Sequence, residues 1–215
     1  MMDTLQQIGV KYGTDKSIHK YHNITYLDIY DKYFNNIRND VKKILEIGIL
    51  NGLSLLMWKE YFPNATIYGI DINPDCKKFE DDRIKIYIGD QSDYDFLNKV
   101  KEEIGLCDII LDDGSHITKH QIVTYDVFNN SVIDGGYYVI EDLRNSYEEF
   151  SGGYDLRNVW PGMTYNNIND PLKNYRKDFN EWIESKIKDL DFHKQNMKLF
   201  SIHFYPMIVI FENLK

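Results

Sequence analysis

The stretch "KKILEIGILNG", residues 42–52, decides the fold, because an apolar run of strand length ends there in a glycine turn. Its isoleucines and leucine are typical of a strand that is buried on both faces. Gly48 and Gly52 lead into a helix expected to begin near Leu53, where the first N–H groups have no partner inside the helix. The stretch therefore predicts a strand, a tight turn and a helix.

Four further apolar runs of strand length follow: "TIYGIDI" (66–72), "RIKIYIGD" (83–90), "DIILDD" (108–113) and "GGYYVIEDL" (135–143). Helical patterns separate them. One has Ser92 as its expected N-cap and Gly105 as its stop, and another covers residues 117–130. This alternation predicts an α/β fold, with a parallel sheet covered by helices on both faces.

The last third of the chain predicts one helix and a hairpin. The helix is indicated by an apolar stripe that is typical of core packing, at Leu172, Tyr175, Phe179, Trp182, Ile183, Ile187 and Leu190. The segment "KLFSIHFYPMIVIFEN" (198–213) contains two strands with only a few residues between them, so they must be antiparallel. Residues 1–40, which show a helical pattern at Leu27, Tyr30, Phe34 and Ile37, are expected to form a helical cap segment, and residues 41–215 the main domain.

Composition narrows the function classes. The chain has 215 residues, of which 43% are hydrophobic, and a net charge of −9. This acidic balance argues against nucleic acid as a partner. No run of about 18 apolar residues occurs, so no membrane insertion is indicated, and a cytoplasmic location is expected. Cys76 and Cys107 lack metal-ligand spacing, and Cys107 is expected to be a buried thiol.

The carboxyl ends of the expected strands carry the candidate ligand-binding residues, because ligands of open parallel sheets bind beyond those ends. Glu46, Gly48 and Gly52 stand at the first end, where missing side chains let a ligand approach the backbone. Their G-x-x-x-G spacing is not that of dinucleotide binders, and a plain strand-to-helix turn looks the same. The turn is therefore a weak signal when taken alone.

The next two strand ends add acidic groups. Asp71 stands where a carboxylate would accept hydrogen bonds from ribose hydroxyls, although a solvated strand-end aspartate is the alternative. Asp90 is placed to accept from an adenine amino group, with Gln91 as a further contact. Capping of the next helix by Ser92 explains part of this motif without any ligand.

With these residues in place, the chain resembles the class I S-adenosylmethionine-dependent methyltransferases. Its motifs "KYGTDKSIHKYH", "LEIGILNGLSLLMWKEYFPNA" and "DDGSH" followed by "VIEDL" resemble the metal-dependent sugar O-methyltransferases of the macrocin and mycinamicin type. The resemblance covers roughly residues 42–215. It implies a Rossmann-like, doubly wound, mostly parallel seven-stranded sheet with an antiparallel C-terminal hairpin strand. It also implies that Glu46, Gly48, Gly52, Asp71 and Asp90 bind S-adenosylmethionine.

The resemblance also implies a metal site. In this fold the strands ending in "DDGSH" and "VIEDL" are adjacent, so Asp113, Glu141 and Asp142 should converge and repel one another unless a cation lies between them. Relatives hold magnesium there, and all-oxygen ligation suits Mg²⁺ or Mn²⁺. We therefore expect these three acids as metal ligands, while Asp112 turns away or orients the loop.

His116 and Asp113 are the expected catalytic residues. His116, three residues after Asp113, is the expected general base. A metal would lower the pKa of a sugar hydroxyl that the histidine then deprotonates. The alternative is that Asp113 and Ser115 only cap the following helix and His116 lies on its surface. His19 and His22 fold over the ligands or merely brace the N-terminus. His203 is expected at a satisfied core position.

The expected activity is thus transfer of a methyl group to the hydroxyl of a small-molecule sugar or nucleotide-sugar. A surface polysaccharide or a glycosylated natural product remains open as the acceptor, and so does a homo-oligomeric assembly. Two alternatives stay open: a catechol-type O-methyltransferase, and a non-catalytic module that only binds the cofactor. The aromatic loop 146–171, with Tyr147, Tyr154, Trp160 and Tyr165, is expected to be either a lid or an ordinary surface loop.

Overall fold

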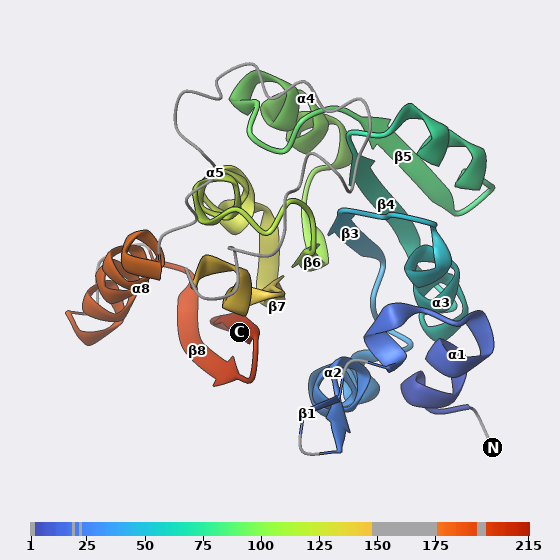
Figure 1. The fold of residues 1–215 in the computed structure, drawn as a ribbon, viewed down its shortest axis with the longest axis horizontal. Coiled ribbons are helices and arrows are strands. Elements are labelled where there is room, and N and C mark those ends of the chain that lie inside the picture. The colour runs from blue at the N-terminus through green and yellow to red at the C-terminus, as the bar shows by residue number, and fades with distance from the viewer. Residues whose placement is uncertain (1–2, 19, 22, 148–175, 193–196) are drawn as a thin grey trace.

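A seven-stranded sheet forms the centre of the computed structural model, which describes residues 3–147 except 19 and 22, residues 176–192 and residues 197–215. The order of its strands is β5-β4-β3-β6-β7-β9-β8 (Figure 1). Their bounds are β3 (Lys43–Ile47), β4 (Thr66–Asp71), β5 (Ile84–Ile88), β6 (Cys107–Asp112), β7 (Val132–Ile140), β8 (Leu199–Tyr205) and β9 (Ile208–Asn213). Strands β3 to β7 pair in parallel, whereas β9 lies antiparallel between β7 and β8. The prediction of a mostly parallel sheet with an antiparallel C-terminal hairpin strand is confirmed.

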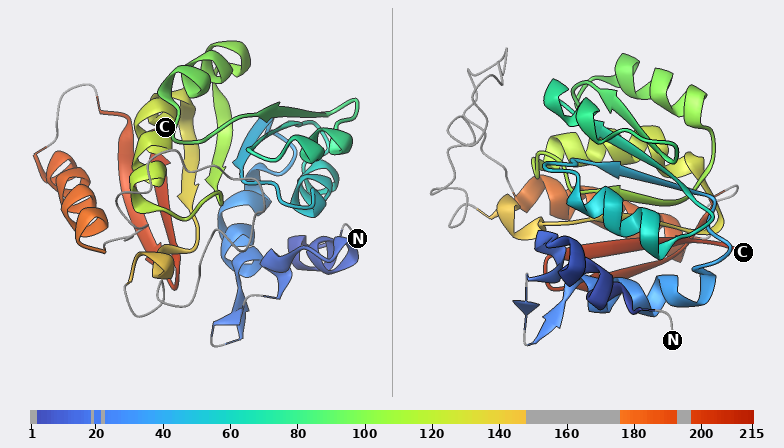
Figure 2. Two further views of the ribbon diagram at one scale, coloured as in Figure 1. Left: turned by 45° about the horizontal axis from the view of Figure 1, so that its top comes forward. Right: turned by 90° about the vertical axis from the view of Figure 1, so that its right-hand side faces the viewer.

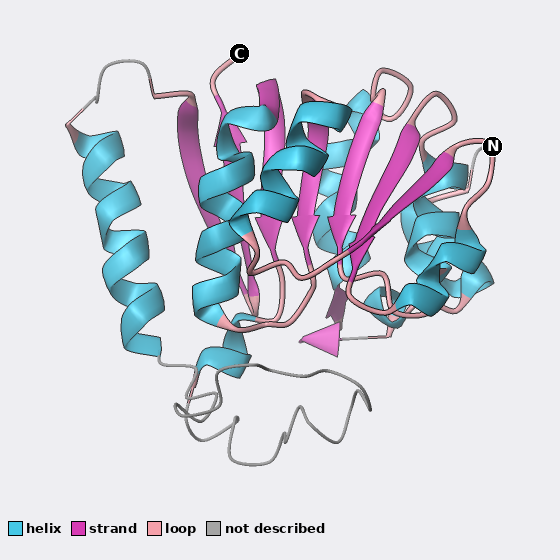
Figure 3. Cartoon of the chain, turned by 90° about the horizontal axis from the view of Figure 1, so that it is seen from above, coloured by secondary structure: helices cyan, strands magenta, loops and turns pink. Residues whose placement is uncertain are grey.

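Helices cover both faces of this sheet (Figure 3). One face carries α1 (Leu5–Tyr12), α2 (Tyr26–Phe34) and α3 (Leu53–Tyr61), and the other α4 (Tyr94–Ile104), α5 (Thr118–Phe128) and α8 (Arg176–Asp191). Strand β3 shows how the layers form, because successive side chains of a strand point to opposite faces. Ile44 is buried in the core under α2 and α3, and Leu45 in the core under α4 and α5.

Short 3₁₀ turns and a small ribbon complete the described elements. The turns are η1 (Asp15–Ser17), η2 (Asn35–Ile37), η3 (Pro74–Phe79), η4 (Asn129–Ser131) and η5 (Leu143–Ser146). The ribbon pairs β1 (Lys20–Tyr21) with β2 (Ile24–Thr25). In the described part of the chain, no helix combines the length and apolar character needed to cross a bilayer. Cys107 is a buried free thiol, as expected.

The N-terminal helices pack directly against the sheet domain (Figure 2). Capping boxes at Thr4 and Thr25 start α1 and α2, and Gly13 ends α1 in a left-handed conformation. Leu27 and Tyr30 of α2 are buried in the same core as α3 and β3. The N-terminal segment is therefore built into one face of the sheet, where it can reach the carboxyl ends of the strands.

Helix starts test the local predictions. Helix α3 begins at Leu53, as expected. The prediction of Ser92 as the N-cap of α4 is wrong, because Asp93 caps this helix by accepting from the N–H groups of Asp95 and Phe96. Both residue types are good N-caps, so pattern alone does not choose between neighbours. The expected stop at Gly105 is confirmed.

The apolar stripe of the last helix is confirmed in part. Phe179 and Ile183 of α8 are buried, whereas Ile187 is 40% exposed, so the stripe leaves the core toward the end of the helix. The ring of Trp182 packs against Tyr125. The first positions of the predicted stripe, Leu172 and Tyr175, lie outside the described residues.

Candidate active site

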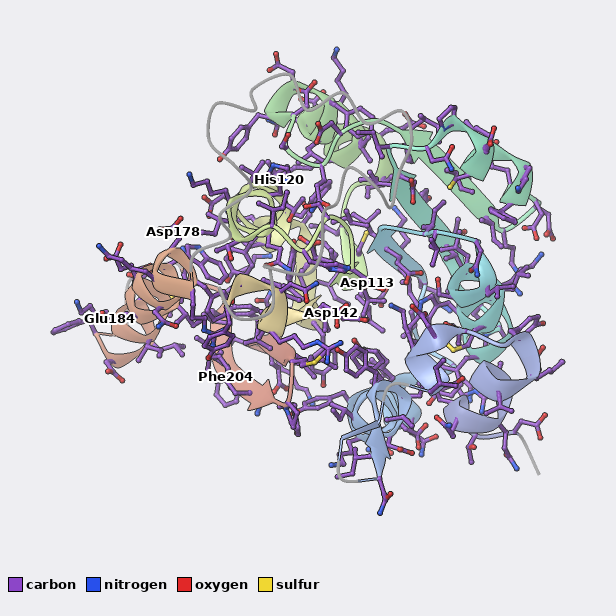
Figure 4. The ribbon with its side chains drawn as sticks, in the orientation of Figure 1. Asp113, His120, Asp142, Asp178, Glu184 and Phe204 are labelled. Atoms are coloured by element: carbon purple, nitrogen blue, oxygen red, sulfur yellow. The ribbon has the colours of Figure 1, made fainter. Side chains whose placement is uncertain are left out.

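Two carboxylates meet where β6 and β7 end. Asp112 pairs with Ile140 in the parallel register, so the residues that follow, Asp113 and Glu141–Asp142, leave the sheet side by side. Figure 4 shows Asp113 and Asp142 close together at the centre of the molecule. Asp113, His116 and Asp142 each offer a possible ligand atom, and these atoms all lie within 4.8 Å of one another. The predicted convergence of the two strand ends is therefore present.

The imidazole of His116 lies between the two aspartates. Its Nδ1 is 4.0 Å from Oδ1 of Asp113, and its Nε2 is 3.5 Å from Oδ2 of Asp142. His116 and Asp142 both have a φ of +57°, a conformation that persists in non-glycine residues only where the surroundings impose it. The three side chains keep 17–23% of their surface exposed, so a ligand can reach them.

A lysine from the N-terminal segment completes the cluster. Lys16 is 1% exposed, and its Nζ donates to Oδ2 of Asp113 and, at 2.9 Å, to Oε2 of Glu141. The same Nζ lies 3.4 Å from Oε1 of Glu46. Sequence reasoning missed this residue, although the "GTDK" motif that contains it was recognised. Its contacts span 97 and 125 residues of chain, which no local pattern reveals.

Two tyrosines of α2 hold the acids at the end of β7. Tyr30 donates to Oε1 of Glu141 at 2.5 Å, and Tyr26 donates to Oδ1 of Asp142 at 2.6 Å. Sequence reasoning assigned Tyr30 to the apolar stripe of this helix and gave Tyr26 no role. Both oxygens of Glu141 therefore accept a hydrogen bond from the N-terminal segment, and this residue is only 1% exposed. Glu141 thus lies behind Asp113 and Asp142 rather than beside them on the open side.

The charges of this cluster do not balance. Burial alone would lower the pKa of Lys16, but attraction by Asp113, Glu141 and Glu46 outweighs it and raises that pKa well above its ordinary value. Burial, with repulsion from Asp113, raises the pKa of Glu141 well above its ordinary range. Burial also raises the pKa of Glu46 to about 7, against the opposing attraction of Lys16. Among the described residues, Lys16 pairs with three of the four acids of the cluster, Glu46, Asp113 and Glu141. When the four acids are ionised their negative charge exceeds that of the lysine, and a divalent cation would offset it.

Asp112 turns away from this site, as expected. It is fully buried, and its carboxylate accepts hydrogen bonds from Thr124 of α5 and from the side-chain amide of Gln91. Burial raises its pKa above the ordinary value. Asp112 therefore anchors the turn that presents Asp113 and His116.

The two glycines of the first turn are required by packing. Gly48 has a φ of +84°, and a Cβ there would lie 2.2 Å from the carbonyl oxygen of Asp113. Gly52, the N-cap residue of α3, has a φ of +73°, and its Cβ would lie 2.5 Å from the ring of Phe79. The close approach at Gly48 brings the first turn against the turn that carries Asp113.

Asp71 braces the glycine turn. Its Oδ2 accepts from the backbone N–H groups of Ile49 at 2.9 Å and Leu50 at 3.2 Å, and its Oδ1 accepts from Asn73 at 2.8 Å. Leu50 has a φ of +46°, so this turn is also held in an unfavourable conformation. The predicted ribose contact of Asp71 stays a prediction, and the structure adds a bracing role.

Asp90 and Gln91 also contact protein groups. Asp90 accepts from the N–H and the hydroxyl of Ser92, both at 2.8 Å. Gln91 accepts from the N–H of Ser115 and donates to Asp112 at 3.2 Å, so it ties β5 to the turn after β6. The adenine contacts predicted for Asp90 and Gln91 remain predictions.

Other singled-out residues fall outside the cluster or outside the described residues. Nε2 of His203 hydrogen-bonds with Ser201 at 2.8 Å and lies 3.4 Å from Glu212 within the hairpin. Its side chain is 36% exposed, so the prediction of a core position is wrong. Tyr147 is 45% exposed, with the guanidinium of Arg176 4.7 Å from its ring centre. The residues outside the described ranges are His19, His22, Tyr154, Trp160 and Tyr165.

The chain is similar in sequence to known O-methyltransferases. No family model matches the chain. It is 36% identical over 160 residues to the 8-demethyl-8-alpha-L-rhamnosyl tetracenomycin-C 2'-O-methyltransferase of Streptomyces olivaceus, covering 70% of this chain and 41% of the relative. It is 40% identical over 131 residues to the mycinamicin VI 2''-O-methyltransferase of Micromonospora griseorubida, covering 58% of this chain and 33% of the relative. The chain thus spans less than half the length of these relatives.

Solved structures agree with these sequence matches. The mycinamycin-pathway methyltransferase MycE, in complex with Mg, SAH and mycinamycin VI, matches 99% of this chain with a TM-score of 0.77 and 28% identity. The match covers 55% of the MycE chain. A putative caffeoyl-CoA O-methyltransferase from Staphylococcus aureus matches with a TM-score of 0.56 and 17% identity, which shows a shared fold alone.

Proposed function

Because this chain has the class I S-adenosylmethionine-dependent methyltransferase fold and its homologues are sugar O-methyltransferases, we propose that it transfers a methyl group from S-adenosylmethionine to a sugar hydroxyl. One observation carries the proposal: Asp113, His116 and Asp142 converge on the open side of the sheet's carboxyl edge, where ligands of this architecture bind.

The donor set fits a divalent cation. Asp113 and Asp142 offer carboxylate oxygens on the accessible side of the cluster, and the surrounding carboxylates outnumber the single lysine. Oxygen donors favour Mg²⁺ or Mn²⁺ over softer metals. When bound, such an ion lowers the pKa of a coordinated hydroxyl. We assign Asp113 and Asp142 as ligands. Glu141, the third acid expected from the resemblance, is held by Lys16 and Tyr30.

His116 is assigned as the general base. Its position between Asp113 and Asp142 orients the imidazole, and both carboxylates stabilise the imidazolium that forms when the ring accepts the hydroxyl proton. The hydroxyl oxygen forms its bond to the methyl carbon as the carbon–sulfur bond breaks, and the sulfonium becomes a neutral thioether. The remaining task of the protein is to align oxygen, carbon and sulfur.

The glycine turn is assigned to the cofactor. Gly48 and Gly52 let the turn adopt its shape, because protein atoms lie where their side chains would be. The N-terminus of α3 follows this turn, and its first N–H groups are placed to meet a ligand. Asp71 and Asp90 supply carboxylates at the ends of β4 and β5 for the ribose and adenine of the nucleoside. Glu46 lies at the inner side of this turn, buried against Ser54 and Trp58.

The acceptor is proposed to be a sugar, because the relatives act on a rhamnosyl tetracenomycin and on mycinamicin VI, as their names state. A nucleotide-sugar, a surface polysaccharide or a glycosylated natural product could present the hydroxyl. A catechol-type acceptor has less support, since the match to the caffeoyl-CoA enzyme shows the fold alone.

The test separates binding from catalysis. S-adenosylhomocysteine is titrated calorimetrically into the purified protein, and labelled S-adenosylmethionine is then incubated with candidate glycosides and Mg²⁺. We expect nucleoside binding and transfer of the label to a sugar hydroxyl, with transfer abolished by a chelator. If the nucleoside binds, but no acceptor receives the label and Mg²⁺ changes nothing, the result would favour the non-catalytic module. Failure to bind the nucleoside would contradict the proposal as a whole.

A further inference from the structure

We propose that Gln91 is a positioning residue for the catalytic turn, residues 113–116, which follows β6 and carries Asp113 and His116. Its side-chain amide ties the loop after β5 to this turn and keeps the two side chains in place for metal binding and proton transfer. The inference rests on the proposed function, because it concerns the same site. Gln91 acts through the turn rather than on the reacting atoms, so it is not a catalytic residue.

The amide of Gln91 bonds to both sides of the catalytic turn. Its Oε1 accepts from the N–H of Ser115 at 2.5 Å, and its Nε2 donates to Oδ1 of Asp112 at 3.2 Å. These two partners stand immediately before His116 and Asp113 in the chain. One side chain thus fixes the neighbours of the proposed base and of the proposed metal ligand.

Gln91 makes these bonds from a distant strand. Strands β4 and β3 lie between β5 and β6 in the sheet, yet the loop after β5 reaches the catalytic turn. Gln91 is only 7% exposed, so little water is present to replace its hydrogen bonds. A buried donor or acceptor that loses its partner is costly. The two bonds therefore restrict the turn more strongly than exposed bonds would.

The glycine at position 114 is explained by the same side chain. A Cβ on Gly114 would overlap the side-chain amide of Gln91. Gly114 does not have a positive φ, so a left-handed backbone is not the reason for a glycine here. The amide therefore packs directly against the backbone of the catalytic turn, in addition to its two hydrogen bonds.

The catalytic turn needs restraint from outside. His116 has a φ of +57°, which is uncommon for a residue other than glycine and persists where the surroundings impose it. Its neighbour Ser115 is held at its N–H by Gln91 and at its hydroxyl by Nδ1 of His120, at 3.0 Å. Since His120 belongs to α5, the turn is held by that helix and by the loop after β5. Removing either partner should let His116 relax.

Gln91→Met tests the amide, because methionine is also long and unbranched but replaces neither hydrogen bond. Mn²⁺ affinity is measured by calorimetry and by the electron paramagnetic resonance of free Mn²⁺, with no turnover needed. It should fall by about tenfold or more, as is usual when a group that orients a metal ligand is lost. The kcat of methyl transfer at saturating metal should fall by about 10²-fold, since a small displacement of a reacting group has that effect.

Asn213→Leu is the matched control. Asn213 is also 7% exposed, and its amide donates to the carbonyls of Val132 and Ile133 at 3.1 and 3.3 Å. Those residues begin β7, whereas the catalytic site lies beyond the other end of this strand. The control should lower the melting temperature, as Gln91→Met does, without changing Mn²⁺ affinity. If both variants lose Mn²⁺ affinity equally, general destabilisation explains the result and the inference is wrong.

A reversed pair tests the hydrogen bond itself and covers the case in which Gln91→Met does not fold. Gln91→Glu alone sets two buried carboxylates side by side and should lower the melting temperature. Adding Asp112→Asn restores one amide and one carboxylate, with donor and acceptor exchanged, and the glutamate still accepts from Ser115. The double variant should regain stability and bind Mn²⁺ within about threefold of the wild type. A double variant that is no more stable than Gln91→Glu, or that binds Mn²⁺ about tenfold more weakly than the wild type, would overturn the inference.

The failures of the two ideas can be told apart. Affinity for S-adenosylhomocysteine is measured in parallel, because Gln91 is also a predicted cofactor contact. If the wild type binds Mn²⁺ and folded Gln91→Met binds it as tightly, the inference is wrong whatever happens to nucleoside binding, while the proposed metal site stands. If the wild type binds the nucleoside but no Mn²⁺, the metal part of the proposed function fails and the inference fails with it. If the wild type binds neither, the proposed function fails as a whole.

Discussion

The two halves of the sheet's carboxyl edge are built differently. In the β3–β4 half, Asp71 braces the glycine turn through backbone groups 21 and 22 residues away. In the β6–β7 half, the acids depend on Lys16, Tyr26 and Tyr30, which are 97 to 125 residues distant in sequence. The glycine turn of the first half is braced by neighbouring strands, although Lys16 also reaches Glu46 at the end of β3. The acids of the second half are held mainly by the N-terminal segment. Nucleoside binding and metal binding should therefore respond to different mutations.

The largest effect is expected from Asp113→Asn, which removes the carboxylate that contacts Lys16 and faces His116. Loss of a metal-binding charge should lower the rate of methyl transfer by about 10³-fold. The affinity for S-adenosylhomocysteine should stay within about threefold, because the glycine turn is braced on its own. Steady-state rates and calorimetry check both expectations.

Asp134→Asn is the matched control for this variant, since Asp134 lies on β7 with a side chain that is 70% exposed. It should change neither the rate of methyl transfer nor the affinity for S-adenosylhomocysteine. If Asp113→Asn lowers the affinity for S-adenosylhomocysteine as much as it lowers the rate of methyl transfer, the two halves are not independent.

Gly48→Ala tests the point where the two halves touch. A Cβ there meets the carbonyl of Asp113 at 2.2 Å and adds strain at a φ of +84°. The combined strain and overpacking should lower the free energy of unfolding by about 4 kcal/mol. Gly13→Ala is the control, because Gly13 has a φ of +71° but nothing within 4 Å of the added Cβ. Its cost should be about 1 kcal/mol, from backbone strain alone. If urea unfolding shows that Gly48→Ala and Gly13→Ala lose the same free energy of unfolding, the close contact between Gly48 and Asp113 is contradicted.

Glu46→Gln probes the buried acid that lies between the halves. The pKa of Glu46 rises from 4.5 to about 7 on folding, so the folded protein binds the extra proton between these values. Stability therefore falls as pH rises through that window, by about 3 kcal/mol from this group. The glutamine variant should lack this part of the pH dependence.

Urea unfolding at pH 4.5 and pH 8 measures that difference. Glu102→Gln, at an exposed position of α4, serves as the control and should keep the wild-type pH dependence. A variant at position 46 whose stability falls with pH as steeply as that of the wild type would show that Glu46 is not the group responsible.

The same contrast explains what could be predicted from sequence. The strands, their order of appearance and the turn glycines follow from local periodicity and spacing, so Gly48, Asp71 and Asp113 were found. Lys16 was not found, because a lysine in a polar stretch gives no sign that it will be buried among acids far along the chain. Tyr30 was assigned only to a core stripe, since an apolar pattern conceals a hydroxyl at the ring's end. The metal ligands remain predictions, and the structure adds the groups that hold the acids in place.

The smallest expected effect comes from Tyr26→Phe, which removes the hydrogen bond to Asp142 at 2.6 Å. Groups that orient a ligand typically contribute tenfold or more to metal affinity, so Mn²⁺ binding should weaken by about tenfold. Tyr61→Phe loses a comparable tyrosine–aspartate bond, to Asp31 at 2.9 Å and away from the acidic cluster. Both variants should lose about 1–2 kcal/mol of stability, and only Tyr26→Phe should lose metal affinity. If both variants bind Mn²⁺ as the wild type does, Tyr26 of α2 supports the fold but does not orient Asp142. The acids of the β6–β7 half would then be held in place by Lys16 and Tyr30.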